Sequence, residues 1–242
     1  NAKAYIAALQ SRLMALGGHI VCHALVTELI RANGRIEGVQ ATVADQEYRF
    51  RARHGVILAA GDYANSPELI AEYKGSDFSH IEGINPYATG DGHRLARNIG
   101  AELVNMDITY GPEIRFVPPS RKAFVQLLPT YGPVARLMGM LLPFVPAVVL
   151  QALIKRLLVT WQHPEDALYD HGAILINNRG ERFCNERSYP EREIAIARQP
   201  GGICYSLLDE RVARLFSEWP NFISTAPKIA YAYVNDYLKL RP

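Results

Sequence analysis

The 242-residue chain has few cysteines, no clustered histidines and almost no net charge, and each of these absences excludes a class of protein. The three cysteines, Cys22, Cys184 and Cys204, are far apart and form no CxxC pair, which argues against a disulfide framework and suits a reducing cytoplasm. The seven histidines lack the paired spacing of metal ligands, so we predict no metal site. The net charge of +2 comes from scattered Lys and Arg residues and predicts no nucleic-acid partner.

Two features are also absent near the start of the chain. The first residues, "NAKAYIAALQ", have neither an initiator Met nor the charged-then-apolar pattern of a signal peptide. Residues 54–66, "HGVILAAGDYANS", read like the last strand of a dinucleotide-binding domain, in which Val56 to Leu58 lead into small residues. Such a domain normally opens with a glycine-rich phosphate loop, and no such loop precedes this strand. We therefore expect the chain to be a fragment of a longer protein.

The first sixty residues do contain a helix followed by a strand meander. Residues 3–16 place apolar side chains at helical spacing, and Gly17 ends that helix. Three strand segments follow, at 19–30, 35–43 and 47–52. Asn33-Gly34 is typical of a tight hairpin turn, and a buried strand at 56–60 closes the unit. This order predicts an α/β plus α+β fold that includes a partial, Rossmann-like domain with a β-meander.

A second loop of small residues lies within residues 88–107, "ATGDGHRLARNIGAELVNMD". Gly90-Asp91-Gly92 stands at the start of a predicted helix. It is not a Rossmann fingerprint, because Leu95 takes the place of the third glycine and no strand runs directly into the loop. By spacing alone this is an ordinary helix cap. The alternative is that its N–H groups and the Asp91 carboxylate hold ligand hydroxyls or a phosphate.

The composition shifts after residue 111, where prolines become frequent and residues 137–154 form a long uncharged run. Pro143 and Pro146 interrupt that run, which argues against a membrane span. We expect a buried helical pair in a cap domain. The alternative is an apolar surface that makes peripheral contact with a membrane or lines the entrance for an apolar substrate.

Residues 172–192, "GAILINNRGERFCNERSYPER", return to strand and turn signals and then become rich in ionisable groups. An apolar strand at 173–176 is followed by a polar turn at 177–180. The ionisable groups that follow are Arg182, Glu186, Arg187, Tyr189 and Arg192. Most such loops are solvated, but Phe183 and Cys184 indicate that one side is buried, which would shift the pKa values of neighbouring groups.

Three segments, in this order, resemble the succinate dehydrogenase/fumarate reductase flavoprotein family, which includes the 3-ketosteroid dehydrogenases: "ILAAGDYANSPELI", "ATGDGHRLARNIGAELVNMD" and "GAILINNRGERFCNE". The resemblance extends over most of residues 1–190 and implies an FAD-dependent oxidoreductase. In that family a cap domain interrupts the flavin domain. Residues 1–110 are then the remainder of the FAD-binding domain without its GxGxxG unit, and residues 111–242 are an incomplete cap or substrate domain.

The resemblance also implies two cofactor-binding segments, made of Ala59, Ala60 and Gly61 and of Thr89, Gly90, Asp91 and Gly92. The first matches the family's small residues, beside which the backbone approaches FAD, although Asp62 stands where the family usually has a second glycine. The second matches the family's Thr-Gly-Asp-Gly, whose Asp contacts the sugar-like chain of the flavin. Since the family's adenosine and pyrophosphate contacts lie mostly upstream, we predict weak or no FAD binding by these residues alone.

The loop after residue 181 bears on the branch of the family. Its match to the dicarboxylate enzymes' Arg-Phe-x-Asn-Glu consists of Arg182, Phe183, Asn185 and Glu186. The position of that branch's catalytic arginine is occupied by Pro190, which neither donates a proton nor clamps a carboxylate. The branch's Thr-Glu-x-x-Arg has no counterpart, and Gln162-His163-Pro164 only echoes its His-Pro-Thr. Chemistry on small dicarboxylates is therefore disfavoured.

The ketosteroid branch carries Asn-Glu-x-x-Pro-Tyr, in which a tyrosine supplies a catalytic hydroxyl, and here the order is reversed to Tyr189-Pro190. Tyr189 is either catalytic or a packing residue. The catalytic candidates are Tyr189, Arg192, Glu186 and Arg187, with Glu186 orienting an arginine. We predict dehydrogenation or reduction of a C–C bond next to a carbonyl, on a bulky apolar ketone such as a 3-ketosteroid. The alternatives are a fumarate reductase-type enzyme that uses Arg192, and a flavin-free binding module.

Overall fold

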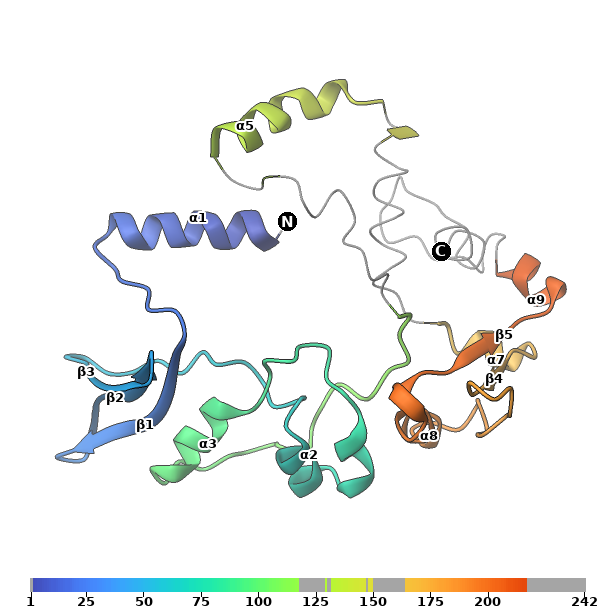
Figure 1. Ribbon diagram of the computed structural model, residues 1–242, viewed down its shortest axis with the longest axis horizontal. Helices are drawn as coiled ribbons and strands as arrows, with labels where there is room; N and C mark the ends of the chain where they lie inside the picture. The colour runs from blue at the N-terminus through green and yellow to red at the C-terminus, as the bar shows by residue number, and fades with distance from the viewer. Residues whose placement is uncertain (1, 118–128, 130–131, 147, 150–163, 217–242) are drawn as a thin grey trace. The chain divides into compact units, whose positions relative to one another are not determined.

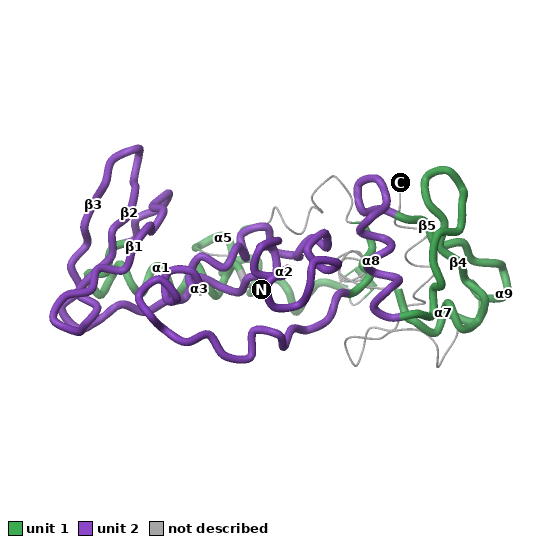
Figure 2. Tube along the Cα trace, turned by 90° about the horizontal axis from the view of Figure 1, so that it is seen from below, with its two compact units in different colours: residues 1–19, 113–188, 204–242 green, residues 20–112, 189–203 purple. Residues whose placement is uncertain are grey.

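The structure is a computed structural model that describes residues 2–117, 129, 132–146, 148–149 and 164–216. The chain divides into two compact units (Figure 2). Unit 1 comprises residues 1–19, 113–188 and 204–242, and unit 2 comprises residues 20–112 and 189–203. The division expected from the sequence, at residue 110, stays a prediction.

Unit 2 contains the expected antiparallel meander, in which β2 (Arg35–Val43) lies between β1 (Ala24–Ala32) and β3 (Gln46–Arg51) (Figure 1). Ala41 on β2 pairs with Val26 on one side and Tyr48 on the other. The predicted hairpin turn is confirmed, because Asn33 and Gly34 both have positive φ angles, of 52° and 76°. Residues 19–23 are not part of β1, so the strand begins later than predicted.

The helical part of unit 2 consists of α2 (Pro67–Tyr73), the 3₁₀ helix η1 (Ser76–His80), α3 (Asp91–Asn98), α8 (Glu191–Ala197) and η3 (Pro200–Gly202). Helix α2 begins where it does because the Ser66 side chain accepts a hydrogen bond from the Leu69 N–H and Pro67 occupies the first turn. Its buried face joins a core cluster of the unit, made of Tyr63, Leu69, Ile70 and Met106. Helix α3 begins at Asp91, which confirms the predicted helix start, and Gly90 and Gly100 flank it with positive φ angles.

Unit 1 contains α1 (Ala2–Ala15), α5 (Gly132–Leu141), η2 (Leu142–Phe144), α7 (Ala167–Asp170) and α9 (Glu210–Leu215). It also contains a two-stranded antiparallel sheet of β4 (Ile174–Ile176) and β5 (Tyr205–Leu207). The predicted helix at 3–16, the strand at 173–176 and the polar turn after it are all confirmed. The Asn177 carbonyl closes that turn by accepting the Gly180 N–H at 3.0 Å.

The prediction of a buried strand at 56–60 is wrong. Residues 55–62 have no strand assignment, and the side chain of Ile57 is 92% exposed. A buried strand needs hydrogen-bonded neighbours, and in the part of the chain that the structure describes no strand pairs with this segment. Both sheets of the described residues are antiparallel, so the Rossmann-like arrangement is not confirmed.

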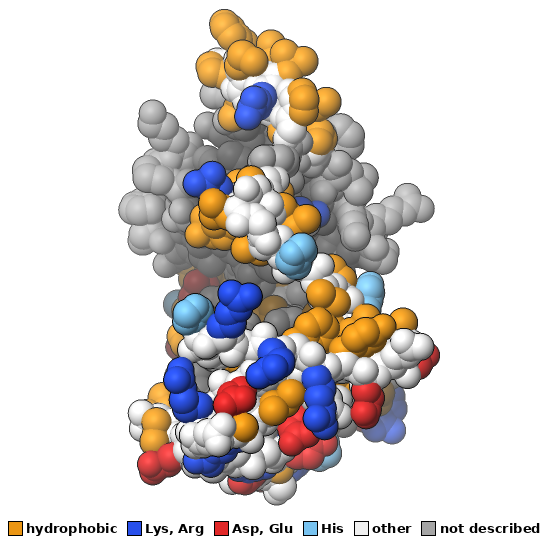
Figure 3. All heavy atoms as spheres, turned by 90° about the vertical axis from the view of Figure 1, so that its left-hand side faces the viewer, with side chains coloured by type: hydrophobic (Ala, Val, Ile, Leu, Met, Phe, Trp, Pro, Cys, Tyr) orange, Lys and Arg blue, Asp and Glu red, His pale blue; other side chains and the backbone are white. Residues whose placement is uncertain are grey.

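The predicted burial of residues 137–154 is also wrong for the residues that the structure describes, and 147 and 150–154 lie outside them. Pro143 lies in η2, directly after α5, and thus interrupts the apolar run as expected. Side chains of this segment, among them Met140 and Phe144, are exposed. Apolar side chains lie at the surface in the view of Figure 3. Among the described residues, no helix has both the length and the apolar character to cross a membrane.

Candidate functional site

The two segments expected to hold the cofactor lie side by side in unit 2. The Gly90 N–H donates to the Asp62 carbonyl at 3.2 Å, and the Asn65 N–H donates to the Ala88 carbonyl at 2.9 Å. A Cβ atom at Gly92 would lie 3.1 Å from the Cβ atom of Ala60. Residues 60–65 therefore run against residues 88–92, although the sequence separates them by more than twenty positions.

The two positive-φ glycines of this pair of segments differ in their surroundings. Gly61 has a φ of +83°, and no atom lies within 4 Å of the point where a Cβ would stand. Ala59 and Ala60 beside it are exposed, so this backbone is open to a ligand. Gly90 is buried instead, and a Cβ there would collide with Leu69 and lie 2.9 Å from the Cβ of Tyr63. The backbone at Gly61 thus borders open space, whereas the backbone at Gly90 is packed too closely against Leu69 and Tyr63 to accept a side chain.

Asp91 presents a half-exposed carboxylate at the start of α3, beside the open backbone. The Thr89 hydroxyl donates to its Oδ2 atom at 2.9 Å, and Arg94 Nη1 lies 3.4 Å from its Oδ1 atom. Each oxygen keeps a lone pair for a ligand hydroxyl. The sequence reasoning missed Arg94, which stands one helical turn after Asp91, the spacing at which oppositely charged side chains pair.

Glu186 is a structural acceptor rather than an open acid or base. Its side chain is buried and accepts the Leu175 N–H at 2.9 Å and two Arg182 hydrogen bonds at 2.9 and 2.6 Å. Burial raises the pKa of Glu186, but the hydrogen bonds from Arg182 and Leu175 outweigh it and hold the pKa below its ordinary value. The carboxylate thus fastens the loop after residue 181 to β4.

Replacement of Glu186 by Gln is expected to lower the free energy of unfolding by about 1–3 kcal/mol at pH 7, because a charged acceptor of buried hydrogen bonds is lost. Since the folded-state pKa is depressed, the contribution is complete above about pH 4.3 and is lost as the pH falls through the folded-state pKa. Denaturant unfolding at pH 7 and pH 3 measures both effects. Glu210→Gln, which breaks the exposed Glu210–Arg214 pair, is the control and should cost less than about 1 kcal/mol. Equal losses for the two variants would contradict this role.

The arginines proposed for catalysis already have carboxylate partners. Arg187 Nε lies 2.7 Å from Asp170 Oδ1 in unit 1. Arg192 is only 5% exposed, and its Nη2 and Nε atoms lie 2.5 and 3.0 Å from Glu193 Oε1. Arg192 therefore stands in a buried ion pair at the start of α8. Neither arginine presents an uncompensated positive charge for a substrate carboxylate.

Tyr189 is 56% exposed, and its hydroxyl lies against Gly111, where a Cβ atom would collide with it. Tyr189 and Arg192 belong to unit 2, as do the two candidate cofactor segments. Glu186 and Arg187 belong to unit 1, so the structure divides the four catalytic candidates between the two units. Gln162 and His163 lie outside the described residues.

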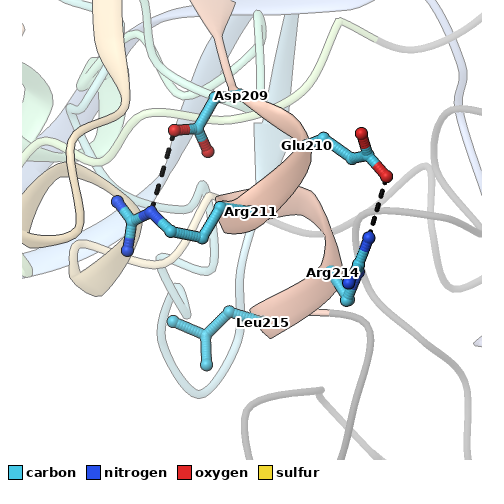
Figure 4. A pocket seen from close by; sticks show the side chains of 5 residues that line it. All are labelled: Asp209, Glu210, Arg211, Arg214 and Leu215. Atoms are coloured by element: carbon cyan, nitrogen blue, oxygen red, sulfur yellow. Dashed lines mark hydrogen bonds and ion pairs between the residues drawn. The ribbon is translucent and has the colours of Figure 1, made fainter.

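A surface pocket in unit 1 is lined by Asp209, Glu210, Arg211, Arg214 and Leu215 (Figure 4). Its charged side chains pair with one another, Arg214 with Glu210 at 2.9 Å and Arg211 with Asp209 at 3.8 Å. Asp209 also accepts the Val212 N–H as the N-cap of α9. The residues that line this pocket thus belong to α9 and its N-cap, and their charges pair with one another. None of the predicted site residues lines the pocket. In the described part of the chain, no group of acidic, His or Cys side chains could hold a metal ion.

Residues 1–122 of the 242 match the family described as FAD binding domain. The chain belongs to this family. The resemblance read from its motifs is thereby confirmed, and FAD is the cofactor of the family. The match contains both segments that the fold brings together in unit 2.

The curated proteins similar to this chain include oxidoreductases. The chain is 26% identical over 215 residues to the NADH:acrylate oxidoreductase of Vibrio harveyi, an alignment that covers 86% of this chain and 17% of that protein. It is 34% identical over 122 residues to the 3-oxosteroid 1-dehydrogenase of Mycolicibacterium smegmatis, covering 48% of this chain and 21% of that protein. The chain thus spans about a fifth of the length of these relatives.

Among solved structures, the open conformation of a flavocytochrome c3 fumarate reductase is similar, with a TM-score of 0.53 and 19% identity. The similarity covers 86% of this chain and 30% of that one, and it supports a shared fold.

Proposed function

We propose that the intact protein containing this chain is an FAD-dependent oxidoreductase that removes or adds two hydrogens across a C–C bond next to a carbonyl. The observation that carries the proposal is the junction of residues 60–65 with 88–92, which places an open backbone beside an oriented carboxylate at a helix N-terminus. That donor and acceptor set suits the hydroxyls of FAD. The relatives with dehydrogenase and reductase names support the same chemistry.

Ala59, Ala60, Gly61 and Asp91 are the residues that would hold FAD in this part of the protein. The small side chains leave the backbone accessible, and the Asp91 carboxylate accepts hydroxyl hydrogens. When bound, FAD supplies the hydride acceptor or donor at the β carbon. The protein must then polarise the carbonyl and move the proton at the α carbon.

Tyr189 is our candidate for the proton-handling group, and unit 2 connects it to the cofactor segments. The Tyr63 hydroxyl donates to the Met106 carbonyl, and Lys74 Nζ donates to Thr109 Oγ1 at 2.5 Å. These bonds hold residues 106–109 against Tyr63 and Lys74. Gly111 comes two residues later and lies against the Tyr189 hydroxyl. The segment that follows Tyr189 is also attached to the rest of unit 2, because Nη2 of Arg198, at the end of α8, lies 2.6 Å from Asp77 Oδ1 of η1.

We further propose that the substrate is a bulky apolar ketone rather than a small dicarboxylate. A dicarboxylate site needs arginines free to form bidentate contacts with the substrate. Arg182, Arg187 and Arg192 instead pair with carboxylates of the protein itself. A phenol such as Tyr189 suits a neutral carbonyl, because it can donate a hydrogen bond without a full charge. The expected cytoplasmic location and peripheral membrane contact through residues 137–154 stay predictions.

Reduction of an α,β-unsaturated carboxylate is the second candidate, because the acrylate oxidoreductase aligns with 86% of this chain. Two assays of the purified intact protein distinguish the two candidate functions. One supplies a 3-ketosteroid with a dye as electron acceptor, and the other supplies fumarate or acrylate with a reduced dye as electron donor. Steroid desaturation alone supports the ketone proposal, whereas acid reduction alone overturns it in favour of the second candidate. A visible spectrum without flavin, even after FAD is added, would overturn both in favour of a binding module.

Gly111→Ala is expected to lower kcat about tenfold in the intact protein while FAD binding stays unchanged. The added Cβ would meet the Tyr189 hydroxyl, and the half-exposed ring can move away only by shifting the phenol from its position. Steady-state kinetics in the wild-type and Tyr189→Phe backgrounds measure the effect. The substitution should have little effect in the second background, since the hydroxyl is already absent. An equal loss in both backgrounds would show that Gly111 acts independently of Tyr189.

A further inference from the structure

We propose that Arg94 is a positioning residue for FAD: its guanidinium joins the loop before α3 to the start of α2 and thereby orients the Asp91 carboxylate toward the cofactor. This inference rests on the proposed function, because it assumes that Asp91 contacts FAD.

Arg94 uses its two terminal nitrogens for two different parts of the fold. Nη1 donates to the Thr89 carbonyl at 2.5 Å and lies 3.4 Å from Asp91 Oδ1. Nη2 donates to Ser66 Oγ at 2.7 Å and to Glu68 Oε2 at 3.1 Å. One planar group thus spans the residues just before α3 and the N-cap and first turn of α2.

The α2 side of this bridge is itself well ordered. Ser66 is only 2% exposed, and its hydroxyl accepts the Leu69 N–H at 3.4 Å while it lies 3.1 Å from Glu68 Oε2. Hydrogen bonds from the Glu68 backbone N–H and the Ser66 hydroxyl, with the nearby Arg94 charge, lower the pKa of Glu68. Glu68 is therefore a carboxylate at neutral pH and keeps the Arg94 guanidinium on this side. Arg94 is anchored to the buried N-cap rather than to solvent-exposed groups alone.

The bridge matters for the cofactor because Asp91 is half exposed and would otherwise rotate freely about its side-chain bonds. Thr89 holds one carboxylate oxygen and Arg94 faces the other, and Arg94 also holds the carbonyl of Thr89. The loop geometry and the carboxylate orientation are thus set before the ligand arrives. Such preorganisation strengthens binding by removing part of the ordering cost.

The same helix offers a matched control in Arg97. Arg97 Nη1 lies 2.9 and 3.0 Å from the two carboxylate oxygens of Glu72, so it also joins α3 to α2. Glu72 is in the C-terminal half of α2, away from Thr89 and Asp91. Arg94→Met and Arg97→Met remove the same charge and the same kind of link between the two helices, and they differ in the contact with the loop.

The test titrates the apo form of the intact protein with FAD and follows flavin fluorescence for the wild type, Arg94→Met, Arg94→Lys and Arg97→Met. We expect the Kd for FAD to rise about tenfold in Arg94→Met and nearly as much in Arg94→Lys, because an ammonium lacks the two-nitrogen fork. We expect it to change less than about twofold in Arg97→Met. Thermal unfolding of the apo forms measures how much each substitution destabilises the fold.

A double-mutant cycle with Asp91→Asn separates positioning from simple stability. If Arg94 acts through Asp91, the Arg94→Met effect on the Kd should largely disappear in the Asp91→Asn background. Equal Kd values for Arg94→Met and Arg97→Met, or full additivity with Asp91→Asn, would overturn the inference and leave the proposed function intact. A wild-type protein that binds no FAD would overturn the proposed function and the inference with it.

Discussion

Replacement of Tyr189 by Phe in the intact protein is expected to lower kcat by about 10²- to 10⁴-fold, the usual contribution of a positioned proton-transfer group. The substitution removes only the Tyr189 hydroxyl, which lies against Gly111, and retains the ring. FAD content should equal that of the wild type, because residues 59–61 and 89–92 are unchanged. Steady-state turnover, together with the visible spectrum of the flavin, measures both quantities.

Tyr87→Phe is the control for this experiment, because Tyr87 belongs to the same unit and is more exposed than Tyr189. It should leave kcat within about twofold of the wild type, as exposed substitutions usually have small effects. If the Tyr189→Phe enzyme had the same kcat as the control, Tyr189 would be a packing residue rather than a catalytic one.

Replacement of Gly90 by Ala is expected to destabilise the protein by about 2–5 kcal/mol and to weaken FAD binding. The left-handed φ of +77° costs an alanine about 1–2 kcal/mol. Its Cβ would also collide with Leu69 and lie 2.9 Å from the Cβ of Tyr63, and such overpacking adds about 1–3 kcal/mol. Relief of the collision would displace Asp91, the next residue. Denaturant unfolding and FAD titration measure the two losses.

Gly100→Ala separates the two causes, because Gly100 has a similar φ of +88° but no atom within 4 Å of an added Cβ. It should show only the conformational cost, about 1–2 kcal/mol, and leave the affinity for FAD unchanged. Equal destabilisation by the two substitutions would show that Leu69 and Tyr63 move aside without cost, and that backbone strain alone determines the loss.

Much of the local structure could be predicted from residue patterns. Asn33-Gly34 and the alternating residues on either side of it identified the hairpin, because a two-residue turn with positive φ angles strongly favours that pair. Gly90 and Asp91 marked the start of α3 for a similar reason, since few residues other than glycine adopt a left-handed N-cap. The motifs also identified the family, because they occur in a fixed order over a long stretch of the chain.

The candidate site was predicted only in part, since its residues act through partners from distant segments. Residues 59–61 and 89–92 carried recognisable motifs, whereas Arg94 and Ser66 carried none strong enough to single them out. The bond from Arg94 Nη2 to Ser66 Oγ joins positions 28 residues apart, and no local pattern encodes it. Likewise, the sequence pattern around Arg192 does not show that its side chain is buried in an ion pair with Glu193.

The sequence by itself determined the meander, the start of α3 and the membership in an FAD binding domain family, because turn residues, caps and motifs act over a few neighbouring positions. Only the tertiary structure decided that residues 56–60 form no buried strand, with 57–60 exposed, and which carboxylate each arginine takes. The physical reason is that burial and ion pairing depend on which segments come together, and an apolar run or a charged side chain is compatible with several partners.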